Sequence, residues 1–234
     1  MSLNGAFGHE PGAPGQQIRT EPMQQRSAAR LSALLDAAAA VVDEVGFDRI
    51  TTAMVAERAG ASIGTVYRYY PDRVAVLHAL RERAVLRCRQ RVAEELGARQ
   101  PKTWWDAVDC AVTAFVGLYR FEPGFRILHF ADRDRAPISA TDDVAGFFAR
   151  QLANVLVDEF GLPAGPDLIF RLEITVEIAD ALLSRAFQSN PQGDPRFIAE
   201  SRRIMHDYLA GFYGPSAGAP PTLRAWAEVQ PTVL

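Results

Sequence analysis

The chain has 234 residues, of which 48% are hydrophobic and 23% are charged, and its formal net charge is −3. This composition is typical of globular proteins, and it excludes a wholly disordered chain, which buries too little apolar surface to offset the entropy of ordering. No apolar run reaches the roughly 18 residues of a membrane-spanning helix, and residues 1–15 lack the basic and apolar regions of a signal peptide. We therefore expect a cytoplasmic protein with no membrane partner.

Charge is divided unevenly along the chain. Residues 1–100 carry 13 Arg and 11 acidic residues, whereas residues 101–234 carry 12 basic and 17 acidic residues. The first part is thus the better candidate to face a polyanion, although nucleic-acid binding needs a local basic patch rather than a basic total. The two cysteines, Cys88 and Cys110, fit no metal or redox spacing and are expected to be buried apolar thiols. The four histidines are scattered singly, so neither a metal nor a cofactor is predicted.

The N-terminal part is predicted to be helical after a mobile tail over residues 1–20, which is rich in Gly and Pro. Apolar residues recur every three or four positions over residues 27–45, and Gly46 then ends this first helix. The next three helices each begin at a polar residue that can cap them, and glycine or proline residues mark where the short ones end. These are a short helix capped by Thr51 or Thr52, a short helix from Ser62 to Tyr69, and a long helix capped by Asp72 over residues 73–96.

The C-terminal part has the same helical periodicity and no alternating pattern long enough for a sheet, so the predicted fold is all-α. A loose segment follows over residues 214–234, where Gly and Pro recur. The helices expected between these limits span residues 103–121, 125–130, 142–160, 167–187 and 194–212.

Two short helices meeting at Ala59-Gly60-Ala61 have helix-turn-helix spacing. Gly60 can adopt the positive φ that the turn favours. Ala56 is small enough for the second helix to cross it, and Val66 is placed to fill the angle between the helices. A plain helical corner inside an enzyme has the same spacing, but donors on the second helix favour DNA, whose major groove such a helix enters. Those donors are Thr65, Tyr67, Arg68 and Tyr69.

A longer set of residues agrees in order and without gaps with a known family. The set is Gly46-Phe47, Thr51-Thr52, Ala56, Ala59-Gly60, Ser62, Gly64-Thr65-Val66-Tyr67, Tyr69-Tyr70 and Asp72-Arg73. Residues 27–80 thereby resemble the DNA-binding domain of the tetracycline-repressor (TetR) family. The resemblance implies a homodimeric regulator, usually a repressor that a small-molecule effector releases from a double-stranded DNA operator. It also implies a three-helix helix-turn-helix domain over residues 21–72, joined to a helical ligand-binding and dimerisation domain over residues 73–213.

The resemblance also implies which residues meet DNA. Those expected at or beside phosphates are Thr51, Thr52, Ser62, Tyr67 and Arg73, the last in place of the family's usual Lys. Those expected at base-facing or groove-wall positions are Ile63, Gly64, Thr65, Arg68 and Tyr69. Pro71 and Ala53 depart from the family's pattern, which leaves Arg68 as the only charged side chain of the second helix. For Tyr67, a ring packed under the helix is the alternative.

Aromatic residues concentrate in the C-terminal part and could enclose an apolar pocket, although ordinary core is the competing interpretation for each. Polar side chains on otherwise apolar helix faces are further candidates for contact with a ligand. Glu173 and Glu177 share one such face with Asp180, and the alternative for them is a stripe exposed to solvent. The ligand-binding candidates are Trp104, Phe115, Tyr119, Phe125, Arg126, His129, Phe147, Phe170, Glu173 and Glu177. The helix over 125–130 is further expected to act as a lever against the long fourth helix.

The last two helices carry more apolar surface than a monomer needs, and the corresponding pair forms the dimer interface in the TetR family. Burial under the segment around Trp226 is the alternative. The interface candidates are Leu182, Phe187, Phe197, Ile204, Tyr208 and Phe212. A helical enzyme or ligand carrier without DNA binding is the competing function, but the sequence has no nucleophile, phosphate-binding or metal motif that supports an enzyme.

Overall fold

The computed structural model describes residues 20–125 and 144–214. These residues form helices and no strand, which confirms the all-α prediction. The helices are α1 (Thr20–Val45), α2 (Thr52–Arg58), α3 (Ile63–Tyr69), α4 (Arg73–Arg99), α5 (Trp104–Phe121), α6 (Val144–Phe160), α7 (Pro166–Phe187) and α8 (Pro195–Tyr213). No helix in the described ranges is long and apolar enough to cross a membrane. The predicted helix over 125–130 lies outside the described residues beyond Phe125. The predicted tail over 1–20 and the predicted loose segment over 214–234 also lie outside them, apart from Thr20, which begins α1, and Gly214, which caps α8.

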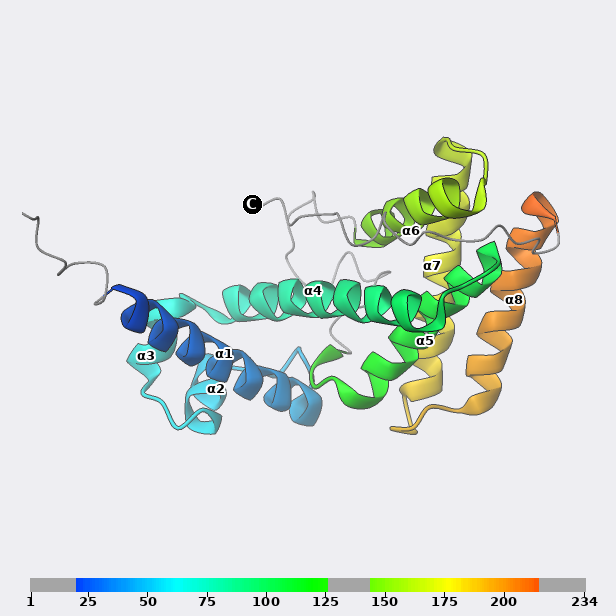
Figure 1. The fold of residues 1–234 in the computed structure, drawn as a ribbon. Coiled ribbons are helices and arrows are strands. Elements are labelled where there is room, and N and C mark those ends of the chain that lie inside the picture. The colour runs from blue at the N-terminus through cyan, green and yellow to red at the C-terminus, as the bar shows by residue number, and fades with distance from the viewer. Residues whose placement is uncertain (1–19, 126–143, 215–234) are drawn as a thin grey trace, which may run out of the picture.

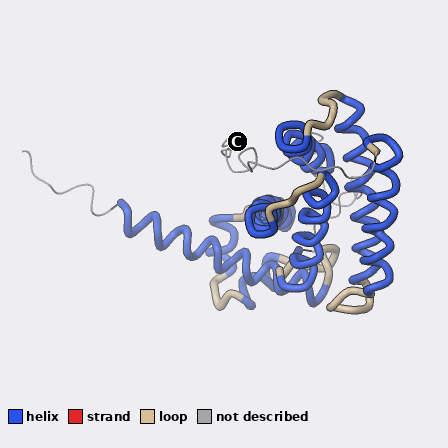
Figure 2. Tube along the Cα trace, turned by 45° about the vertical axis from the view of Figure 1, so that its right-hand side comes forward, coloured by secondary structure: helices blue, strands red, loops and turns tan. Residues whose placement is uncertain are grey.

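The helices gather at the two ends of α4. Figure 1 shows α1, α2 and α3 along one end of this helix and α5 to α8 around the other. The tube in Figure 2 shows the first turns of α1 extending away from the rest of the molecule. We predicted that this helix begins near residue 27, and that start was wrong: α1 begins at Thr20. The reason is that Pro22 falls in the first turn, where a missing N–H breaks no helical hydrogen bond.

Two separate hydrophobic cores lie along α4. The N-terminal core packs Leu34, Ala38 and Ile50 against the start of α4, which contributes Val76 and Leu80. We call this unit, α1 to α3 with the first turns of α4, the N-terminal domain. The C-terminal core begins one turn later on α4 and includes α5 to α8, which form the C-terminal domain. The residues of α4 buried in this second core are Ala84, Cys88, Val92 and Leu96. A single helix therefore belongs to both domains.

Side-chain caps define the starts of the N-terminal helices as predicted. The hydroxyl of Thr51 accepts a hydrogen bond from the backbone N–H of Met54 at the start of α2, and Asp72 caps α4 in the same way. Each cap satisfies a backbone N–H that has no partner within its own helix. The turn between α2 and α3 also has the expected conformation, because φ at Gly60 is +59°.

Candidate DNA-binding site and ligand-binding domain

Helix α3 is held across α2 by small buried side chains. Val66 is completely buried in the N-terminal core, and Ala56 of α2 is buried with it. The Ser62 hydroxyl caps α3 by accepting a hydrogen bond from the Thr65 backbone N–H at 3.2 Å. These contacts confirm the predicted roles of Ala56 and Val66 in the helix-turn-helix. They fix one face of α3 in the core and leave the opposite face in solvent.

The solvent face of α3 carries both apolar and cationic side chains. Ile63, Gly64, Tyr67 and Arg68 are exposed, whereas Thr65 and Tyr69 are half-buried. Tyr67 retains 51% of its surface, so its ring does not lie under the helix. This face combines hydrogen-bond donors with apolar surface, which are the groups that contact base edges and thymine methyls in a major groove.

Hydroxyl groups from α1 and α2 hold the two tyrosines of α3. Thr52 Oγ1 donates a hydrogen bond to the Tyr67 hydroxyl oxygen at 3.4 Å. The Ser27 and Tyr69 hydroxyls lie 3.2 Å apart and share a second hydrogen bond. Ser27 was not a predicted site residue, because its contact with Tyr69 spans 42 residues and no local pattern marks it.

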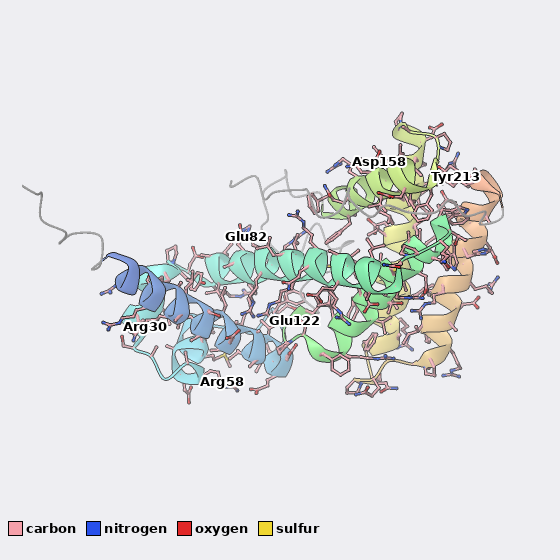
Figure 3. All side chains as sticks on the ribbon, in the orientation of Figure 1. Arg30, Arg58, Glu82, Glu122, Asp158 and Tyr213 are labelled. Carbon is pink, nitrogen blue, oxygen red and sulfur yellow. The ribbon has the colours of Figure 1, made fainter. Side chains whose placement is uncertain are left out.

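The arginines of the N-terminal domain differ in whether they have a hydrogen-bond or ion-pair partner within the protein. Arg58 pairs with Glu44, and the hydrogen bond from Arg58 lowers the pKa of the Glu44 carboxyl. Within the described part of the chain, Arg68 has no hydrogen bond or ion pair. Arg30 is exposed on α1, at the end of the molecule that carries α3 (Figure 3). Arg68 on α3 is therefore available to a phosphate or a base and Arg30 on α1 to a phosphate, whereas Arg58 is paired with Glu44.

Arg73 has a role inside the protein. Its guanidinium donates a hydrogen bond to the backbone carbonyl of Phe47 at 2.8 Å. The Nε atom is buried and has no hydrogen-bond partner within the described ranges. Arg73 thus ties the start of α4 to the turn between α1 and α2. The phosphate contact expected for Arg73 stays a prediction, and this structural contact was not anticipated.

An aromatic cluster lies inside the C-terminal domain at the end of α5. Phe125 makes edge-to-face contacts with Tyr119, at 5.2 Å between centroids, and with Phe115, at 6.1 Å. Phe148 of α6 adds a further edge-to-face contact with Phe115 at 5.8 Å, and Phe147 contacts Phe148. The Tyr119 hydroxyl lies 3.0 Å from the Ser184 hydroxyl of α7, so the cluster has a polar side. Phe148 was among the aromatic residues of the C-terminal part but not among the ligand-binding candidates, and no local pattern marked Ser184.

The other ligand-binding candidates do not all join this cluster. Trp104 stacks on His206 at the opposite end of α5, with 5.9 Å between ring centroids. Phe170 is 58% exposed on α7. Glu173 and Glu177 are half-buried on α7, whereas Asp180 on the same helix is buried. Arg126 and His129 lie outside the described residues.

The dimer-interface candidates occupy different depths. Phe187 is 1% exposed and stacks on Tyr119 at 4.9 Å between centroids, so it belongs to the core of a single chain. Phe197 and Tyr208 are partly buried against that core. Leu182 and Ile204 are half-buried, and Phe212 is 50% exposed. The prediction placed Phe187 on the surface because apolar periodicity does not distinguish between two apolar faces of one helix.

The two cysteine side chains are free and buried, as expected. Burial raises the pKa of the Cys110 thiol to about 11 and raises that of Cys88 well above its ordinary value. Both thiols are therefore protonated at neutral pH and are poor nucleophiles. No group of three metal-ligating side chains occurs within the described ranges.

The fold and the exposed helix α3 define a helix-turn-helix DNA-binding regulator. Residues 34–80 match the family described as bacterial regulatory proteins, tetR family. Residues 102–213 match the tetracyclin repressor-like, C-terminal domain. The chain belongs to the TetR family of transcriptional regulators.

One solved structure supports this assignment, and two less similar structures share the fold. A TetR-family transcriptional regulator from Streptomyces coelicolor is 32% identical, with a TM-score of 0.65 over 78% of this chain and 98% of that chain. The fatty acid degradation regulator FadR from Bacillus halodurans is 15% identical, with a TM-score of 0.60 over 78% of this chain and 99% of that one. An SmeT–triclosan complex is 20% identical, with a TM-score of 0.52 over 83% and 97% of the two chains. Comparison with curated protein sequences found no match.

Proposed function

We propose that the protein is a ligand-responsive repressor that binds a palindromic operator as a homodimer and is released by a small apolar or amphipathic ligand. Its site of action is the cytoplasm, where the chromosomal operator lies, and its function includes no catalytic step. The observation that carries the proposal is the solvent face of α3, where Tyr67 and Arg68 project from a helix anchored by Val66. In this proposal α3 enters the major groove, and Arg68 reads a base edge.

Unburied apolar surface on α7 and α8 supports the homodimer. Phe170 is 58% exposed and Phe212 is 50% exposed. Ile174 and Ile204 are half-buried but do not pack against the C-terminal core. The Arg171 guanidinium covers the Phe212 ring at 3.3 Å from its centroid. Arginine and aromatic side chains of this kind are enriched at protein–protein interfaces. A second copy of the chain would remove this surface from water.

The aromatic cluster at the end of α5 supports a small-molecule ligand. Its rings supply apolar and π surface, and the Tyr119–Ser184 hydroxyl pair supplies a polar group for orientation. Ligand sites in proteins commonly combine such surfaces with a few polar groups. A protein of the same fold, SmeT, forms a complex with triclosan. We therefore place the effector beside this cluster in the C-terminal domain.

To test DNA binding, the intact protein is used to select fragments of the source organism's genomic DNA, and the fragment that binds most tightly is footprinted. We expect a protected palindrome whose half-sites lie about one helical turn, ~34–36 Å, apart, because a two-fold dimer presents two α3 helices. Binding should weaken steeply as salt increases, since phosphate contacts release counterions. Failure to select any fragment at low salt would support the alternative, a helical ligand-binding protein or enzyme without DNA binding.

The dimer is tested with Phe212→Ala. We expect this change to weaken dimerisation about tenfold, because Phe212 is an exposed aromatic side chain on the proposed interface. Sedimentation equilibrium over a range of concentrations measures the effect. Phe121→Ala is the matched control, because Phe121 is 78% exposed but lies at the end of α5. Equal dimer dissociation constants for the two variants would contradict the interface.

A further inference from the structure

The turn that follows α5 connects the aromatic cluster to the N-terminal domain. It runs from Glu122 to Phe125, and Glu122 lies at the end of α5 that faces α1 and α4 (Figure 3). The Glu122 carboxylate pairs with Arg87 of α4. Glu122 retains only 16% of its side-chain exposure, so the pair is partly shielded from water. The turn is thus fixed to the helix that the two domains share.

Gly124 brings the backbone of this turn directly onto α1. Its N–H donates a hydrogen bond to the Asp43 carboxylate at 2.9 Å. A Cβ atom on Gly124 would lie 2.9 Å from the Cβ and 3.0 Å from the Cα of Ala39. Ala39 is completely buried in the N-terminal core. Because the contact is between backbone and a short buried side chain, no flexible group is present to absorb a displacement.

The next residue of the turn belongs to the other domain. Phe125 is 1% exposed and packs edge-to-face on Tyr119 and Phe115 within the aromatic cluster. One peptide unit therefore separates a side chain inside the proposed ligand region from a backbone atom that rests on α1. A displacement of Phe125 that moves its backbone also moves Gly124, because the two residues share this peptide.

We propose that the Gly124 contact with Ala39 and Asp43 positions α1, and through it α3, and that it carries the effector's signal to the N-terminal domain alongside α4. The inference rests on the proposed function. In the effector-free protein the contact restricts the orientation of the N-terminal domain relative to the C-terminal domain. The distance between the two α3 helices of a dimer is then already restricted before DNA binds, so binding costs less conformational entropy. An effector that shifts Phe125 disturbs the contact and lowers DNA affinity.

The first test compares Gly124→Ala with Gly161→Ala in the intact protein. Both glycines have a positive φ, +74° and +66°, so alanine introduces similar backbone strain at each. Only at Gly124 does the new methyl group meet another helix, because nothing lies within 4 Å of a Cβ at Gly161. We expect Gly124→Ala to bind a wild-type-selected DNA fragment about tenfold more weakly than Gly161→Ala, without effector, in fluorescence anisotropy.

The second test covers the case in which Gly124→Ala fails to fold. Asp43 is exposed, so Asp43→Ala removes the acceptor of the Gly124 hydrogen bond without emptying a core position. Asp48→Ala is the charge-matched control, because Asp48 is also exposed near the end of α1. Losing a negative charge by itself favours DNA binding. We expect affinity to fall about threefold for Asp43→Ala and to stay equal or rise for Asp48→Ala.

The outcomes separate this inference from the proposed function. If wild-type protein selects no DNA, the proposed function itself fails. If wild-type protein binds DNA but each variant binds as its control does, or more tightly, DNA binding stands and the positioning role of Gly124 and Asp43 is overturned. Circular dichroism of all four variants checks that helix content is retained. Weaker binding by a folded Gly124→Ala or Asp43→Ala, relative to its control, supports the inference.

Discussion

Phe187→Ala is expected to lower the free energy of unfolding by about 3–5 kcal/mol, because it empties a fully packed site. Phe187 is 1% exposed and stacks on Tyr119 with an interplanar angle of 10°. A Cβ atom placed on Gly193 would approach the Phe187 ring to 2.7 Å, which shows how closely the chain encloses it. Urea denaturation followed by circular dichroism measures the change.

Phe121→Ala is again the control, because a 78% exposed ring contributes little to the packing of the core. We expect its unfolding free energy to lie within about 0.5 kcal/mol of the wild type. Phe187 was predicted from sequence as a dimer contact. A residue of the dimer interface mainly affects dimer dissociation, whereas a residue of the core mainly affects the free energy of unfolding. A Phe187→Ala variant that unfolds like the wild type but dissociates more readily would contradict the core placement.

Arg68→Ala is expected to remove preference for the operator at one base position. Arg68 is exposed on α3 and makes no ion pair within the described residues, so its removal leaves no partner unsatisfied inside the protein. A bidentate contact from arginine to guanine contributes roughly 1–3 kcal/mol of discrimination, equivalent to about 5- to 150-fold in affinity. Competition between operator and scrambled DNA, followed by fluorescence anisotropy, measures the preference.

Arg30→Ala is the matched comparison for Arg68. Arg30 is exposed on α1 rather than on α3, so in our proposal it can contact phosphate but not a base edge. We expect operator and scrambled DNA to weaken alike for Arg30→Ala, with a smaller salt dependence. If Arg68→Ala behaves in the same way and retains the operator preference, Arg68 is only a phosphate contact.

The helix-turn-helix could be predicted from sequence because its determinants are local. Ser62, Gly60 and Val66 act over a few residues: a cap, a turn with positive φ and a side chain that fills the angle between two short helices. Each role follows from residue type and spacing alone. Gly46 also ends α1 with a positive φ, as its place after the last periodic residue predicted. The start of α1 was harder to predict from sequence, because a proline in the first turn is compatible with either a coil or a helix.

The sequence by itself determined the all-α fold, the helix-turn-helix and the face of α3 that solvent reaches, since these depend on helical period and short-range capping. Only the tertiary structure decided which aromatic residues share a site. Phe187 and Phe212 both lie on strongly apolar helix faces, yet one is enclosed against Tyr119 and the other is half-exposed. The contact of Gly124 with Asp43 likewise joins residues 81 positions apart. Such contacts depend on how whole helices pack, and a helix with more than one apolar face does not specify which face its neighbour covers.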